Sequence, residues 1–494
     1  MIYKNPVLSG FYPDPSVCRA DDRYPGKYFM VCSSFQYFPG VPLFESEDLV
    51  NWRQIGNILS RESQLLLDGA QSSAGIFAPT IRYYNGVFYM VTTNTTTNRN
   101  FYVYTDDIYG EWSEPVNVEQ DGIDPSLYFE DGHAYFMSNG TDDHGDHGVV
   151  QCEIDIRTGK KLSDSSTLWH GSGGRFLESP HLYRIGGWYY LMAAEGGTEY
   201  GHMITCARSR LLWGEYESCP FNPVLTNRNL GGFEIQGVGH GDLIQKQDTG
   251  EWFVIHLGFR QIGQWATYHH IGREVFMSPV KFNDDGWFTV GKNGTTASEF
   301  EIQGSFEQKP CRSAGFADKL DWLYIRRNAP ECYELSDERF ILHGTEQTLD
   351  MMYPTFVGIR QTGLCGSCEC SVKVSSGEGG ITLYMDEQHH HELAVRRTEN
   401  GFEAILRLNI GDAKYIRSSV PLCSDTAQLH IDFSNYVYTF SVIDAKTGVR
   451  SGLGTAQTRY LSTEVAGGFT GVIIGLYSQG SGSSSEFTDF RCEY

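Results

Sequence analysis

Three acidic residues in the first half of the chain stand alone in apolar, uncharged stretches. Asp14 follows Phe11-Tyr12-Pro13, Asp124 follows Gly122-Ile123, and Glu178 follows Phe176-Leu177. A carboxyl group that faces a buried site tends to have a raised pKa, and a neighbouring carboxylate adjusts it further by repulsion. Hydrolysis of a glycosidic bond needs one carboxylic acid to protonate the leaving oxygen and one carboxylate to activate water or to attack. Asp-Pro is also favourable turn chemistry, so the catalytic interpretation requires that the fold bring the three acids together.

A short pattern that recurs five times indicates such a fold. Its copies are Asp14-Pro15-Ser16-Val17, Ala78-Pro79-Thr80-Ile81, Asp124-Pro125-Ser126-Leu127, Ser179-Pro180-His181-Leu182 and His240-Gly241-Asp242-Leu243. Each copy precedes a glycine and an aromatic strand, such as Tyr28-Phe29-Met30-Val31 or Phe88-Tyr89-Met90-Val91. The spacing of the copies, about 46 to 64 residues, is typical of propeller blades. A propeller brings the innermost strand of every blade to one axis, where Asp14, Asp124 and Glu178 would line one cavity.

The sequence therefore predicts an all-β chain of two domains. Residues 1–300 are expected to form a five-bladed β-propeller, and a β-sandwich with similar strands is the alternative for this part. Residues 301–494 contain short alternating strands with Gly and Ser turns, for example 381–384 and 429–433. This texture predicts a concanavalin-like antiparallel β-sandwich.

Net charge restricts the classes of binding partner, and the N-terminal sequence and the cysteines indicate the cellular compartment. The chain has 38 basic and 61 acidic residues and a net charge of -23, which disfavours nucleic acid and anionic membranes but not a neutral sugar. No apolar core of signal-peptide length follows Met1, so we expect a cytoplasmic protein. The twelve cysteines are expected to be free or buried thiols in a reducing compartment. A metal at the Cys365–Cys370 cluster is not favoured, and His389-His390-His391 is expected in an exposed hairpin.

Further motifs carry a resemblance to a known family. They are Asn5-Pro6-Val7 through Ser16, Ser34-Phe35-Gln36-Tyr37-Phe38-Pro39-Gly40-Val41-Pro42, Ser46 to Trp52, Ile76-Phe77-Ala78-Pro79, Gly122 to Ser126, Glu178 to Leu182, Gly237-Val238-Gly239-His240 and Gly272-Arg273-Glu274. In this order they resemble glycoside hydrolase family 43 over about residues 5 to 290. The C-terminal part is similar to the sandwich of its β-xylosidase and α-L-arabinofuranosidase branches.

The resemblance implies hydrolysis by a single displacement with inversion. Asp14 would be the general base, Glu178 the general acid, and Asp124 the residue that tunes and orients that acid. Arg273 would bind a sugar hydroxyl, and Phe35 and Phe77 would wall the sugar site, Phe77 standing where many relatives have Trp. The remaining substrate-binding candidates are Ala78, Ser179 and His240. In relatives that histidine often contacts a calcium ion or its water shell, so Ca²⁺ is a candidate cofactor at His240; no organic cofactor is expected.

The predicted function is an exo-acting hydrolase that releases a terminal pentose from arabinose- or xylose-containing oligosaccharides derived from hemicellulose such as xylan. We predict α-L-arabinofuranose as the preferred sugar, with β-D-xylosidase as a second activity, because Phe77 and the loop from Asn94 to Asn100 depart from the xylosidase-like pattern. Three alternatives remain: a predominant β-D-xylosidase, a retaining fructosidase, and a non-catalytic sugar-binding propeller. Nothing in the sequence indicates the oligomeric state.

Overall fold

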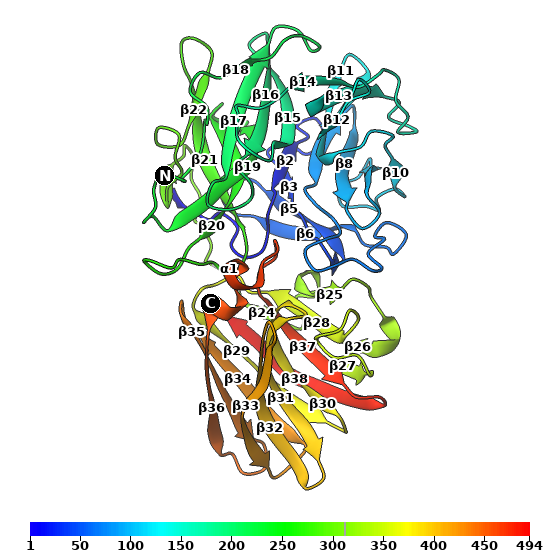
Figure 1. Cartoon of the computed structure of the whole chain (residues 1–494), viewed down its shortest axis with the longest axis vertical. Helices are drawn as coiled ribbons and strands as arrows, with labels where there is room; N and C mark the ends of the chain where they lie inside the picture. The colour runs from blue at the N-terminus through cyan, green and yellow to red at the C-terminus, as the bar shows by residue number, and fades with distance from the viewer. Residues whose placement is uncertain (311–312) are drawn as a thin grey trace.

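The computed structural model describes residues 1–310 and 313–494 and shows an all-β chain in two stacked parts (Figure 1). The first part, blue to green in Figure 1, contains the five sequence repeats. The second part, yellow to red, is a pair of packed sheets. In this view the C-terminus lies where the two parts meet, and the N-terminus lies at the left side of the first part.

In the described part of the chain, residues 16–290 form five four-stranded antiparallel sheets. They are β2 (Ser16–Arg19), β3 (Tyr28–Val31), β5 (Gly40–Ser46) and β6 (Arg53–Leu59); β7 (Thr80–Tyr84), β8 (Val87–Asn94), β9 (Arg99–Thr105) and β10 (Val116–Asn117); β11 (Ile123–Glu130), β12 (His133–Thr141), β13 (His147–Ile154) and β14 (Ser166–Trp169); β15 (Glu178–Ile185), β16 (Trp188–Glu195), β17 (Met203–Ser209) and β18 (Glu217–Ser218); and β19 (Ile235–Gln245), β20 (Trp252–Arg260), β21 (Glu274–Phe282) and β22 (Phe288–Val290).

The first strand of every sheet arises from one copy of the repeat. The strands β2, β7, β11, β15 and β19 contact one another in this order, and β19 also contacts β2, so they close a ring. The predicted aromatic runs form the second strands; Tyr28–Val31 coincides with β3. These second strands, for example β3, β16 and β20, are rich in Tyr, Phe, Met and Val. They are buried on both faces, as expected where one sheet packs against another.

The N-terminal segment packs against the last sheet. The strand β1 (Ile2–Lys4) pairs with β23 (Glu299–Glu301), and Val7 N–H donates to the carbonyl of Val275 in β21 at 2.9 Å. The predicted domain boundary at residues 300 and 301 thus falls inside β23.

Two sheets of the second part pack face to face. The larger contains β24 (Ala314–Gly315), β26 (Tyr333–Leu335), β27 (Arg339–Gly344), β29 (Gly366–Val374), β34 (Thr426–Phe433), β35 (Val437–Asp444), β36 (Arg450–Gln457) and β38 (Ser483–Glu493). The smaller contains β28 (Thr355–Arg360), β30 (Glu378–Asp386), β31 (His389–Thr398), β32 (Gly401–Ile410), β33 (Ala413–Leu422) and β37 (Ile473–Gln479). Alternating burial in β34 and β29 marks strands with one face in this core.

The outer face of the smaller sheet packs against the first part of the chain. Phe356, Tyr384 and Ile405 form one buried cluster with Phe11 and Phe35. The strand β25 (Tyr324–Ile325) pairs with β4 (Tyr37–Phe38) and joins the two parts through the backbone. His389–His391 lie buried in β31, so the predicted exposed hairpin is wrong at these residues.

Helical elements in the described ranges are short. They are η1 (Lys319–Asp321), η2 (Pro330–Cys332), η3 (Thr458–Leu461) and α1 (Thr463–Ala466), and α1 lies between the two parts (Figure 1). Over the residues that the structure describes, no helix has the length and apolar character needed to cross a membrane.

The third residue of each repeat copy links its sheet to the next one. Hydroxyl groups make the first three links: Ile81 N–H donates to Ser16 Oγ (3.1 Å), Thr80 Oγ1 donates to the carbonyl of Pro125 (2.8 Å), and Ser126 Oγ donates to the carbonyl of Pro180 (2.5 Å). These bonds satisfy backbone groups that the sheet ladders leave open near the axis.

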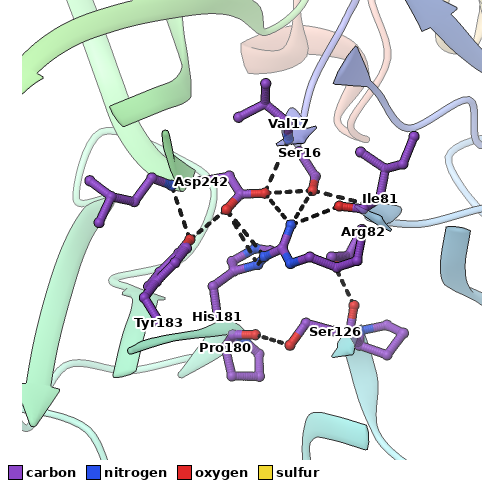
Figure 2. Close-up of polar contacts among 12 residues, drawn as sticks. Ser16, Val17, Ile81, Arg82, Ser126, Pro180, His181, Tyr183 and Asp242 are labelled. Atoms are coloured by element: carbon purple, nitrogen blue, oxygen red, sulfur yellow. Dashed lines mark hydrogen bonds and ion pairs between the residues drawn. The ribbon is translucent and has the colours of Figure 1, made fainter. Parts of the chain in front are cut away.

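Asp242, the third residue of the fifth copy, closes the ring (Figure 2). It accepts a hydrogen bond from Tyr183 in the fourth sheet and, at 2.6 Å and 3.1 Å, from Ser16 Oγ and Val17 N–H in the first. Arg82 reaches the same carboxylate from the second sheet at 2.7 Å. Asp242 is buried; burial raises its pKa, but Arg82, His181 and Ser16 together lower that pKa below its usual value.

Arg82 also fixes a histidine. Its Nη2 lies 2.7 Å from His181 Nδ1, and because a guanidinium can only donate, Nδ1 must be the acceptor. Burial, with the nearby charge of Arg82, lowers the pKa of His181 to about 3 despite the opposing effect of Asp242. His181 is therefore neutral at ordinary pH and carries its proton on Nε2.

We predict that Asp242→Asn lowers the free energy of unfolding by about 3–5 kcal/mol, because it leaves the buried Arg82 guanidinium without its counter-charge. Chemical denaturation measures the change. The matched control is Asp248→Asn. Asp248 forms an ion pair with Lys246, but its side chain is 65% exposed, so we expect this variant to lower the free energy of unfolding by less than about 1 kcal/mol. Equal small losses in both variants would contradict the axial role of Asp242.

Candidate functional site

The acids sit where the chain enters the first strand of a sheet. Asp14 precedes β2 with φ 56°, and Asp124 lies near the start of β11 with φ 52°. The pairing register shifts between Ile123 and Ser126, so a bulge interrupts the ladder at Asp124. Left-handed backbone is uncommon outside glycine and favours Asp and Asn among the other residues. The left-handed backbone thus recurs at both acids, and both side chains are buried.

Asp14 is buried among groups that stabilise its charge. Arg273 Nη1 lies 2.9 Å from Oδ1, Ser33 Oγ donates to Oδ2 at 2.5 Å, and His240 Nδ1 lies 3.6 Å from Oδ1. Burial alone would raise the pKa of Asp14, but Arg273, His240 and the Ser33 hydrogen bond outweigh it and lower the pKa. Asp14 is therefore a carboxylate at neutral pH, the form that a general base requires.

Asp124 shows the opposite behaviour. Burial raises its pKa well above the usual value, and the charges of Glu178 and Asp14 raise it further against the opposing Arg273. The three predicted acids therefore lie close enough to act on one another electrostatically. A site in which neighbouring carboxyls disfavour each other's ionisation retains a proton at a pH where isolated carboxyls would lose it.

Glu178 begins β15 and remains partly accessible, its side chain 17% exposed. His202 Nε2 lies 3.5 Å from Glu178 Oε1, and the His202 side chain is fully buried. Within the described chain neither ring nitrogen of His202 has a hydrogen-bond partner. A Cβ at Gly239 would lie 2.4 Å from this ring, so only glycine lets the β19 backbone approach it. No sequence motif pointed to His202.

Arg273 connects the acids to both parts of the chain. Beyond Asp14, its Nη1 donates to Thr198 Oγ1 at 2.8 Å, and its Nη2 donates to the carbonyl of Phe469 at 3.3 Å. Arg273 immediately precedes β21 and lies beside Asp14, so it occupies the place near the acids that the sequence predicted. Because Asp14 and Thr198 occupy one Nη, the guanidinium is held firmly while its other edge faces the aromatic residues.

Three phenylalanines line the side of the site next to Arg273. Phe35 lies 5.3 Å from Phe77 and 6.0 Å from Phe469 between ring centroids, and the Arg273 guanidinium lies 5.7 Å from the Phe35 ring. Phe35 and Phe77 were predicted from the sequence. Phe469 comes from the second part of the chain, and no sequence motif indicated it. Its N–H donates to Ser73 Oγ of the first part at 2.8 Å.

The other candidates lie beside this group but are mostly buried. Ala78 is 4% exposed and Ser179 2% exposed. Ser179 has left-handed backbone (φ 55°), and among described residues no partner is found for its buried Oγ. His240 also has positive φ (37°); burial lowers its pKa, while Asp14 and Glu178 oppose that change.

The described side chains alone do not form a calcium site at His240. Over residues 1–310 and 313–494, no group of three or more His, Cys, Asp or Glu side chains could hold a metal. Both oxygens of Asp14 already bind Arg273 and Ser33, whereas calcium takes six to eight oxygen ligands. The His181 ring, 6.5 Å from that of His240, is bound by the cation Arg82.

The cysteine cluster is divided between surface and core. Cys365 is exposed and donates to Asn435 Oδ1 at 3.3 Å, while Cys368 and Cys370 are buried in β29. The eleven cysteines of the described chain are all free thiols, as expected; Cys311 lies outside the described residues.

Comparison with known proteins identifies the family. The model described as glycosyl hydrolases family 43 matches residues 3–288, and that of the beta xylosidase C-terminal concanavalin A-like domain matches residues 317–492. The chain belongs to glycosyl hydrolase family 43. It is 36% identical to the non-reducing end alpha-L-arabinofuranosidase BoGH43B of Bacteroides ovatus, covering 99% of this chain and 95% of that protein. It is also 36% identical to a beta-xylosidase of Bacillus subtilis, covering 99% of this chain and 98% of that protein.

A solved structure agrees over the whole length. The structure titled Bacteroides ovatus xyloglucan PUL GH43B has a TM-score of 0.91 and 34% identity and covers 100% of both chains. The chain is thus a family 43 glycosidase with a propeller and a C-terminal concanavalin-like domain. The predicted family is confirmed, and this match gives no support to the fructosidase alternative.

We predict that Ser33→Ala shifts the acidic limb of the family 43 enzyme's pH profile of kcat/KM upward by about one pH unit, because a hydrogen bond to a carboxylate stabilises its charged form. The shift is upward because Ser33 lowers the pKa of Asp14, and activity is lost as pH falls through that pKa. Ser34→Ala is the control, since Ser34 Oγ accepts from Val41 N–H instead of binding Asp14. An unmoved limb in Ser33→Ala would contradict Asp14 as the base.

Proposed function

We propose that this protein is an exo-acting, inverting glycoside hydrolase that removes terminal α-L-arabinofuranose, with β-D-xylosidase as a second activity, from hemicellulose-derived oligosaccharides. One observation carries the proposal: Asp14, held as a carboxylate by Arg273 and Ser33, shares a site with Asp124, whose pKa is raised by burial and by Glu178. Ionised and protonated carboxyls side by side are what acid–base cleavage of a glycoside uses.

In this reaction Asp14 takes a proton from water as the water oxygen bonds to the anomeric carbon. Glu178 gives its proton to the glycosidic oxygen, whose bond to that carbon breaks, and the sugar leaves with inverted configuration. Asp124, whose own pKa is raised by burial and by the charge of Glu178, stands beside that acid and orients it. Arg273 has two roles: it orients Asp14, and it binds and orients a sugar hydroxyl. Inversion needs about 6.5–9.5 Å between acid and base, enough for the water.

The five four-stranded sheets support a five-bladed propeller, because their first strands contact one another in cyclic order. In this assignment the propeller occupies residues 1–300 and the sandwich residues 301–494, with β23 at the boundary.

The position of Phe469 favours exo cleavage of a terminal sugar. Phe469 from the second part lies 6.0 Å from Phe35 and 6.2 Å from Phe77, so the sandwich borders the sugar site on that side and narrows it. A chain-spanning substrate would have to pass this wall, whereas a terminal ring would not. Arabinofuranose is favoured by the arabinofuranosidase among the relatives and by Phe77, while the xylosidases among them support the second activity.

We predict a higher kcat/KM on 4-nitrophenyl α-L-arabinofuranoside than on 4-nitrophenyl β-D-xyloside, because Phe77 shapes the wall beside the sugar. Steady-state kinetics on the purified protein measure the ratio, and NMR of the first-formed product on the xyloside reports the anomer. A xyloside preference of about tenfold or more would reverse the sugar assignment. A first product with retained configuration would exclude the inverting mechanism.

We predict that Glu178→Ala lowers kcat/KM by about 10²- to 10⁴-fold on oligosaccharides, whose leaving groups need a proton. On the aryl glycosides the loss should be much smaller, since 4-nitrophenolate leaves without one. Asp14→Ala is the matched comparison, because both substrates need the base and should lose activity together. Equal losses of Glu178→Ala on both substrates would contradict its role as proton donor.

A further inference from the structure

The buried carboxylate of Glu195 holds the segment of residues 172–175, which precedes Glu178. Glu195, fully buried in β16, accepts Ser172 N–H at 2.7 Å and Gly174 N–H at 2.6 Å. Thr205 Oγ1 donates to the same carboxylate at 2.7 Å, and Gly196 N–H donates to the carbonyl of Arg175 at 2.7 Å. The residues immediately before the proposed acid are therefore held in one conformation.

Phe176, which follows this segment, presents an aromatic ring to solvent. It is 63% exposed and has left-handed backbone, φ 53°. A bulky residue in this region is an outlier, and strain of this kind persists only where the surroundings impose it. Because its ring is exposed and its backbone is strained, Phe176 adds little to the stability of the fold. The exposed ring is therefore a candidate for a binding function.

The Phe176 ring is supported on one side and open on the other. It packs so closely against Gly197 that a Cβ there would lie 3.0 Å from a ring carbon. The Arg175 guanidinium lies 5.0 Å from the ring centroid and is ion-paired with Glu199. The arrangement forms a fixed aromatic platform whose remaining surface is accessible.

The platform belongs to the segments that carry the reacting groups. Phe176 stands two residues before Glu178, which in the proposed reaction must reach the leaving oxygen. Its support Gly197 is followed by Thr198, which accepts a hydrogen bond from the same Arg273 Nη that binds Asp14. Phe35, Phe77 and Phe469 form a separate aromatic group, which contacts Arg273 at the proposed sugar-holding wall.

We propose that Phe176 is the binding platform for the sugar unit that leaves, a neutral pyranose ring of a hemicellulose chain stacked on the open face of the phenyl group. Apolar C–H faces of sugar rings pack on aromatic surfaces, and binding sites place such surfaces beside a few directed polar groups. This inference rests on the proposed function. It adds a subsite on the far side of the scissile bond.

The test compares a leaving group that has a ring with one that has none. In Phe176→Ala, kcat/KM on an oligosaccharide with a terminal pentose should fall about tenfold, the loss expected when one aromatic face no longer covers apolar surface. On the corresponding glycosyl fluoride, whose leaving group is a single atom, kcat/KM should change by less than about twofold, since nothing stacks on Phe176. Phe176→Trp should retain activity on both substrates.

Phe221→Ala is the matched control, because Phe221 is 57% exposed but follows β18, the outermost strand of its sheet. It should leave both substrates unaffected. Equal losses of Phe176→Ala on the oligosaccharide and the fluoride, or no loss on either, would overturn the platform. A wild-type protein inactive on both substrates would overturn the proposed function itself, a result recognisable without any variant.

Discussion

The ring of links around Asp242 is the constraint on which the rest of the structure depends. Five sheets can surround one axis only if the first strand of the last sheet is tied to that of the first sheet. Asp242 makes this tie through Ser16 and Val17, and the buried guanidinium of Arg82 compensates its charge. A buried ion pair adds little net stability compared with apolar packing, but it specifies one arrangement, because any other leaves a charge unpaired.

That ring fixes the acids indirectly. Each acid lies next to a residue that ties its strand to a neighbour: Asp14 stands two residues before Ser16, Asp124 two before Ser126, and Glu178 three before His181. The left-handed turn at Asp14 and Asp124 then aims the carboxyls at a common place. Strand ends, rather than long loops, set the distances among the three carboxyls, as the proposed acid–base chemistry requires.

Much of the first part of the chain could be predicted because its repeat is local. The pattern around Asp14 and its four later copies identified the first strands, and the aromatic runs identified the second. Ser33, Arg82 and His202 escaped prediction, because each acts through a partner distant in sequence and lies in no repeated position. Phe469 belongs to the other domain, so only the docked structure shows its place. His389–His391 were misplaced because the polar run suggested exposure. In the structure, one face of the smaller sheet is covered by the first domain, and His391 on the other face contacts Phe440 of the larger sheet.

Because Phe469 reaches Arg273 from the second domain, the sandwich does more than accompany the catalytic fold. The carbonyl of Phe469 binds Arg273, the residue that keeps Asp14 ionised, so assembly of the two domains and readiness for chemistry are linked. A propeller released from its partner would lose one wall and one anchor of the guanidinium together. Sequence drift in a distant loop of the sandwich could thus retune sugar preference while leaving every acid untouched, which offers the family a route to new specificities.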